Sequence, residues 1–148
     1  MNAFRAIYRF WVSLVTLAVV LQIAFAGYGA FDTADKVDGG TVDEDSFEDS
    51  FGLHIGFGYL IFLATIVLLL LSFGARGKQR ILRSVAVVVL LVIQILLAWT
   101  GASAPYIFGA LHPLNAFLIL GLLGSITYRE WKVERMVPRE PAVAAPPA

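Results

Sequence analysis

The sequence predicts an all-α membrane protein, a polytopic four-helix bundle that runs up-down-up-down. Hydrophobic residues make up 59% of the 148 residues and charged residues only 15%, too little charge to cover a soluble domain of this size. Four apolar runs divide the chain, and basic residues gather in alternate connections between them. The formal net charge is +0, so nothing indicates a nucleic-acid partner.

The four runs each contain about 20 residues, enough to cross a hydrocarbon core of about 30 Å. Their expected spans are about 10–31, 51–73, 81–100 and 108–128. Apart from Arg83 near the start of the third, no acidic or basic residue lies inside a run. The runs do not alternate with period two, which favours helices over a barrel. We expect one transmembrane domain over 1–136 and a disordered Pro/Ala-rich tail over 137–148.

The connections predict the orientation in the membrane. Basic residues precede the first run, separate the second from the third, and follow the fourth: Arg5, Arg9, Arg76, Lys78, Arg80, Arg83, Arg129, Lys132, Arg135 and Arg139. Only Lys36 lies in the other set of connections. By the positive-inside rule, both termini and the middle connection face the cytoplasm. The expected location is the plasma (cytoplasmic) membrane, crossed several times, with the lipid bilayer as first partner.

Two segments near the first run allow alternatives. The outer loop over Asp32–Asp49 carries eight acidic residues, which predicts a solvated, mobile segment or, alternatively, one that attracts cations or docks a partner. Arg5 and Arg9, the apolar run and Ala24-Phe25-Ala26 would also fit a cleaved signal peptide. An internal repeat argues against cleavage, because it makes the first helix part of the bundle.

The repeat relates the two helical hairpins. In the first and third runs, Leu21-Gln22-Ile23 matches Ile93-Gln94-Ile95, and a glycine follows each glutamine at the same distance, Gly29 and Gly101. In the second and fourth runs, Leu53-His54 matches Leu111-His112, followed by matched small residues and isoleucines, Gly58 with Ala116 and Ile61 with Ile119. Such a parallel repeat predicts a pseudo-two-fold axis along the membrane normal, with His54 and His112 at one depth near the outer face.

Two symmetry-related histidines within membrane spans suggest a shared ligand, because ionisable groups there are costly. The chain has no cysteine, which excludes thiolate ligands and covalent haem attachment. Two neutral imidazoles projecting into a bundle suit haem b with both histidines as axial ligands. Zinc would need further ligands, which only outer-loop carboxylates such as Glu48 supply.

The remaining site candidates surround the histidines. Gly58 and Ala116 are expected to let a flat macrocycle approach the backbone, and Gln22, Gln94 and Asn115 to orient imidazoles or meet propionates. The plainer interpretation is that the histidines are interfacial and that the amides only bond helices together. Pro113, directly after His112, suits the first turn of a helix.

Several residues carry a family resemblance. The stretch Ile93-Gln94-Ile95-Leu96-Leu97-Ala98, then Gly101, Pro105 and Leu111-His112-Pro113-Leu114-Asn115-Ala116, resembles one half of the haem A synthases. Those are eight-helix proteins of two four-helix bundles, each with a haem site formed by histidines on its second and fourth helices. The resemblance implies His54 and His112 as an axial pair. This chain has one bundle and no acidic residue in a span, so it is more similar to the non-catalytic half, and more broadly to small bis-histidine b-type cytochromes.

The expected function is therefore haem b binding near the outer face, serving electron transfer or haem handling with a membrane redox protein or a quinone. A cofactor-free membrane interaction or accessory subunit is the alternative. A haem-modifying oxygenase related to haem A synthase is a second alternative, so whether the chain is an enzyme stays open.

Overall fold

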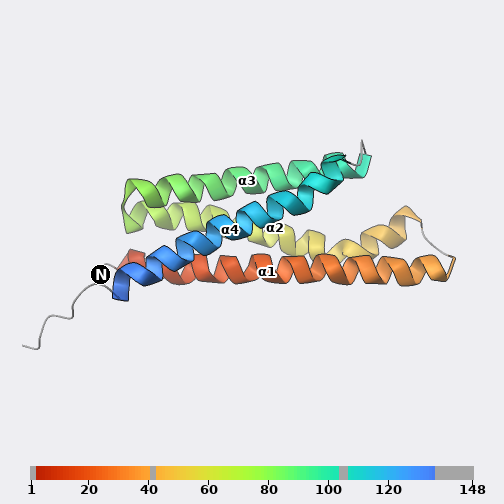
Figure 1. Cartoon of the computed structure of the whole chain (residues 1–148), viewed down its shortest axis with the longest axis horizontal. Coiled ribbons are helices and arrows are strands. Elements are labelled where there is room, and N and C mark those ends of the chain that lie inside the picture. The colour runs from red at the N-terminus through yellow and green to blue at the C-terminus, as the bar shows by residue number, and fades with distance from the viewer. Residues whose placement is uncertain (1–2, 41–42, 104–106, 136–148) are drawn as a thin grey trace, which may run out of the picture.

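The computed structural model describes residues 3–40, 43–103 and 107–135, and consists of four long helices (Figure 1). They are α1 (Ala3–Asp38), α2 (Glu44–Ala75), α3 (Lys78–Ser103) and α4 (Ile107–Arg135). Each is long and apolar enough to cross a membrane, and no strand occurs within the described ranges. The predicted all-α class with four helices suited to spanning a membrane is thus confirmed. The tail over 137–148 lies outside the described residues.

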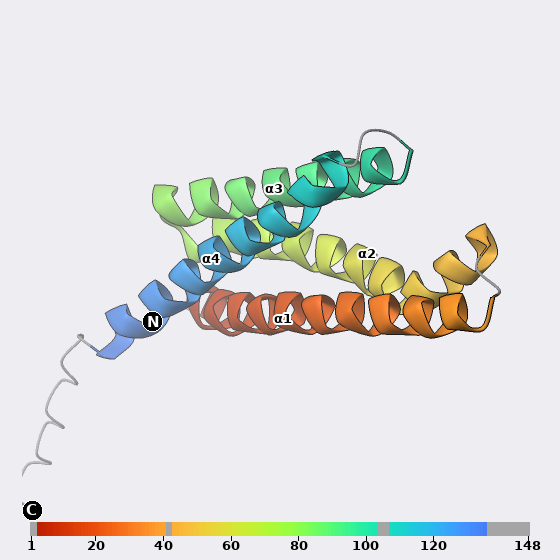
Figure 2. The ribbon, with the colours of Figure 1, turned by 45° about the vertical axis from the view of Figure 1, so that its right-hand side comes forward.

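The helices form a ring in which each contacts the helices before and after it. α1 packs on α2 and α4, and α3 packs on the same two helices. Consecutive helices run in opposite directions, so Ala3 and Arg135 lie at the same end of the bundle (Figure 1). We call this the basic end, and the opposite end, where α1 passes to α2 and α3 to α4, the acidic end. Toward the acidic end, the α1–α2 hairpin diverges from the α3–α4 hairpin (Figures 1 and 2).

The acidic segment between the first two spans is more helical than expected. Helix covers most of the loop predicted over Asp32–Asp49, because α1 continues to Asp38 and α2 begins at Glu44. Lys36 stabilises the end of α1 through an ion pair with Asp32 of 2.9 Å and a 3.0 Å hydrogen bond to Ser50 of α2. The prediction of a loop is therefore wrong for most of this segment, which is helical.

A side-chain cap starts α2. Asp43 accepts a 2.8 Å hydrogen bond from the Ser46 backbone N–H and a second bond from the Ser46 hydroxyl, as an N-cap residue does. These bonds, the hydroxyl's first, hold the pKa of the exposed Asp43 carboxyl below its ordinary value. The cap satisfies the Ser46 N–H, one of the first-turn backbone donors that have no partner within the helix.

The buried core follows the internal repeat. Residues three, seven and ten positions before each glutamine are buried, and so are those seven, eleven and fourteen positions after each histidine. The matched pairs are Val19 with Leu91, Val15 with Val87, Val12 with Ser84, Ile61 with Ile119, Thr65 with Leu123, and Leu68 with Ile126. Spacings that alternate between three and four residues place these side chains on one helix face. The two hairpins therefore contribute equivalent faces to one core.

Candidate functional site

The two histidines face each other across the bundle. His54 comes from α2 and His112 from α4, and their ring centres are 6.1 Å apart with an angle of 63° between the ring planes. Both residues are half-buried. The structure thus brings together the pair that the repeat singled out, one histidine from each hairpin.

Each imidazole is held by a backbone carbonyl of its own hairpin. His54 Nδ1 lies 3.1 Å from the Gln22 carbonyl oxygen, and His112 Nδ1 lies 3.1 Å from the Gln94 carbonyl oxygen. A carbonyl can only accept, so each Nδ1 carries the proton and donates it. In the neutral ring each Nε2 is consequently the unprotonated nitrogen, the tautomer that a metal-binding histidine uses.

The two glutamine side chains act differently. Gln22 Nε2 donates to the His54 backbone carbonyl at 2.7 Å, and its Oε1 is buried without a hydrogen-bond partner. Gln94 Nε2 donates to His112 Nε2 at 3.0 Å, and its Oε1 accepts from Asn115 Nδ2 at 2.7 Å. The α3–α4 hairpin therefore satisfies its imidazole completely, whereas the α1–α2 hairpin leaves one buried acceptor unmatched.

The sequence explains this difference. Asn115 lies three residues after His112 and is buried, with Nδ2 also donating to the Leu90 carbonyl at 2.9 Å. The matched position after His54 is Phe57, which packs edge-on against Phe25 with ring centres 5.1 Å apart. A phenyl ring has no donor for the Gln22 amide oxygen. The repeat thus keeps the imidazole geometry but not the polar network around it.

Gly58 makes room for Gln22. A Cβ at Gly58 would lie 3.0 Å from Gln22 Nε2, so the space expected for a macrocycle at this position holds the amide. Its repeat mate Ala116 is half-buried on α4. Gly58 therefore contributes by leaving space for the Gln22 side chain, whose amide forms the hydrogen bond between α1 and α2.

Matched glycines bring the helices of each hairpin close together. A Cβ at Gly29 would lie 2.9 Å from the Ser50 carbonyl oxygen, and one at Gly101 would lie 2.8 Å from Gly109 Cα. Ordinary side chains do not fit at such a separation. Both contacts lie between the histidines and the acidic end. They hold the two helices of each hairpin close enough for the histidine Nδ1 on one helix to reach the glutamine carbonyl on the other.

Pro113 lies inside α4 rather than in its first turn, because the helix begins at Ile107. The prediction of a helix entry at Pro113 is therefore wrong. Proline has no N–H, so the carbonyl four residues earlier, on Gly109, has no helical donor from this position. Gly109 is also the residue that meets Gly101, so the carbonyl without a helical donor lies at this close contact of α4 with α3.

Few charged or metal-binding groups surround the pair. Phe51 packs edge-on against the His54 ring, with centres 6.1 Å apart. Among the described residues, no three His, Cys, Asp or Glu side chains cluster as a metal site would require, so Glu48 does not complete a zinc site with the histidines. The chemistry available here is that of two imidazole lone pairs and neighbouring amides.

The basic end holds polar contacts that sequence patterns did not reveal. Glu130, only 7% exposed, accepts hydrogen bonds from Arg80 at 2.8 and 3.0 Å. The Tyr8 hydroxyl lies 3.1 Å from the Ser84 hydroxyl. Glu130 lies two residues after the fourth apolar run, so it resembles an interfacial residue, and only the tertiary packing shows that it is buried.

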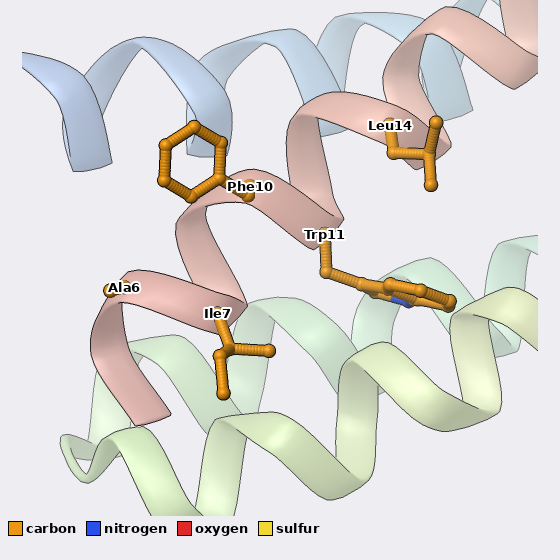
Figure 3. A pocket seen from close by; sticks show the side chains of 5 residues that line it. All are labelled: Ala6, Ile7, Phe10, Trp11 and Leu14. Carbon is orange, nitrogen blue, oxygen red and sulfur yellow. The ribbon is translucent and has the colours of Figure 1, made fainter. Parts of the chain in front are cut away.

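A separate hollow of about 290 Å³ lies on α1, lined by Ala6, Ile7, Phe10, Trp11 and Leu14 (Figure 3). Phe10 and Leu14 are more than half exposed, so the hollow belongs to the outer surface of the bundle. Leu14 precedes Gln22 by eight residues, about 12 Å along the helix. The hollow is therefore not part of the histidine site.

Comparisons of the chain with protein-family models, with curated proteins and with solved structures find no match. The fold and the site themselves define the class: a four-helix protein with helices suited to a membrane and one histidine from each hairpin facing the other.

Proposed function

We propose that the chain binds haem b between His54 and His112 and serves electron transfer or haem handling. The facing imidazoles, 6.1 Å apart between ring centres, carry this proposal. A metal–imidazole nitrogen bond is about 2 Å long, so two imidazoles on opposite sides of one ion have centres about 6 Å apart. The separation therefore suits axial ligation by both rings.

The tautomers support the same proposal. Both Nδ1 atoms donate to backbone carbonyls, so each ring is the tautomer whose Nε2 can bind a metal. Two neutral imidazoles favour a six-coordinate low-spin iron that exchanges single electrons at little structural cost. At the acidic end of the bundle, Lys36 of α1 is a cation, but it is already paired with Asp32. The haem propionates would therefore have to face water.

One rearrangement is required for ligation. The Gln94 amide donates to His112 Nε2, and this hydrogen bond has to open before the nitrogen can bind iron. A half-exposed amide loses about 1 kcal/mol on such a change, which is small beside a coordinate bond. Gln94 can then keep its bond to Asn115 while its N–H turns away.

The cofactor-free alternative rests on the same hydrogen bond. Gln94 and its carbonyl satisfy both ring nitrogens of His112, so the α3–α4 hairpin is complete without any ligand. In that case the polar residues bond helices together, and the protein serves as a membrane interaction subunit.

A reduced-minus-oxidised spectrum separates the two functions. The chain is expressed with ample haem and purified in mild detergent together with His54→Ala, His112→Ala and, as a matched control, Ser125→Ala, whose exposed hydroxyl bonds only to the Leu122 carbonyl. We expect a sharp α-band in the wild type and the control that both histidine variants lose. Colourless wild-type protein would exclude haem binding and leave the membrane interaction subunit as the function. Modified haem in the extract would instead favour the haem-modifying oxygenase.

A further inference from the structure

The buried interior between the histidine site and the basic end is mostly apolar, and its few hydroxyl groups are hydrogen-bonded within the protein: Thr16 pairs with Thr127 at 3.0 Å, and Ser84 with Tyr8 at 3.1 Å. Next to the site it is closed by one buried side chain from each helix: Val19, Ile61, Leu91 and Ile119. Further buried apolar side chains continue the core, namely Val12, Val15, Leu68, Val87, Leu123 and Ile126. Thr65 is buried among them, and its hydroxyl donates to the Phe62 carbonyl of its own helix at 2.8 Å.

This core is thick enough to act as a barrier. On α1, Val12 to Val19 covers seven residues, about 10 Å of helix. Water needs two to four polar partners to occupy a buried position, and the Thr65 hydroxyl already has one within its helix. A proton or ion crossing this region would lose its hydration without gaining polar partners, which is strongly unfavourable.

Toward the acidic end no comparable core follows the histidines: of the residues there whose burial the structure describes, only Gly29 and Ser50 are buried. His54 and His112 are half-buried, and their neighbours Gly52 and Leu111 toward the acidic end are exposed. The two hairpins also diverge toward this end (Figure 2). The polar groups therefore lie on the open side of the apolar core, and the ion pair of Arg80 and Glu130 lies on the other side.

We propose that the histidine site exchanges protons, water and small ligands with the acidic end only, and that the apolar core seals it from the basic end. The inference builds on the proposed function in one respect: with haem bound, electron donors and acceptors would reach it from the acidic side. The accessibility itself does not depend on haem.

Single cysteines test the seal, because the natural chain contains none. Ala116→Cys reports on the site and Thr65→Cys on the core, while exposed Asp45→Cys and Lys78→Cys report on the acidic and basic ends. Each variant is placed in sealed vesicles and treated with a membrane-impermeant maleimide from either side. Thermal melts in detergent establish that each variant is folded.

We expect Ala116→Cys to react from the side that labels Asp45→Cys and not from the side that labels Lys78→Cys. Thr65→Cys should react from neither side, and adding Ile61→Gly should raise its labelling from the acidic side at least tenfold. Labelling of Ala116→Cys from the basic side, or from neither side, would overturn the proposal, as would reaction of Thr65→Cys alone. These outcomes are read without haem, so they are distinct from a failure of haem binding.

Discussion

Replacing Gly101 by alanine tests whether the close contact between α3 and α4 holds the histidine site together. The added Cβ would lie 2.8 Å from Gly109 Cα and 2.9 Å from Gly109 N, distances that force the two backbones apart. Overpacking of this kind costs about 1–3 kcal/mol. Alanine also favours a helix over glycine by about 1 kcal/mol, so we expect a net loss of up to about 2 kcal/mol.

Gly121→Ala is the matched control on α4, since nothing lies within 4 Å of its Cβ position. It should be neutral or more stable by up to about 1 kcal/mol, because only the helix preference acts. Unfolding of both variants in mixed detergent micelles, followed by circular dichroism, measures the difference. Gly101→Ala as stable as Gly121→Ala would refute the role of the contact.

Three further predictions concern polar groups. Gln94→Leu should lower the free energy of unfolding by about 1 kcal/mol, and Gln22→Leu by less, because it also removes a buried unmatched oxygen; equal losses would contradict the asymmetry. Glu130→Gln should cost about 3 kcal/mol by leaving Arg80 without its carboxylate, and Arg80→Met in the same chain should recover much of it in the same assay. The lowered pKa of Asp43 means that its cap is intact above about pH 4 and is lost as pH falls through the folded pKa. Protection from hydrogen exchange at the start of α2, taken relative to the intrinsic exchange rate, should fall there, and Asp43→Ala should abolish this change in protection.

The sequence predicted the helices because their apolar runs are long and carry almost no charge. It also paired His54 with His112, since matched residues in a parallel repeat face one another. It did not predict how far α1 and α2 extend through the acidic segment, where the ion pair of Lys36 and Asp32 stabilises helix outside any apolar run. Apolar periodicity carries no information about such polar contacts.

Details of the site depended on three-dimensional packing. The repeat matched Gln22 with Gln94, but one amide bonds to a carbonyl and the other to an imidazole. This difference follows from Asn115, which has no counterpart in the first hairpin, and the sequence alone could not show which partner it meets. The sequence likewise suggested that Gly58 makes room for a ligand, whereas in the structure the Gln22 side chain occupies that space.

Titration of the purified protein with haem tests the central claim most directly. We expect one haem per chain with the spectrum of a six-coordinate low-spin iron, since both Nε2 atoms can serve as ligands once the Gln94 amide has turned away from His112. His54→Ala and His112→Ala should each give a high-spin spectrum or no binding. A low-spin complex that survives in either variant, or a wild type that binds no haem, would contradict ligation between His54 and His112.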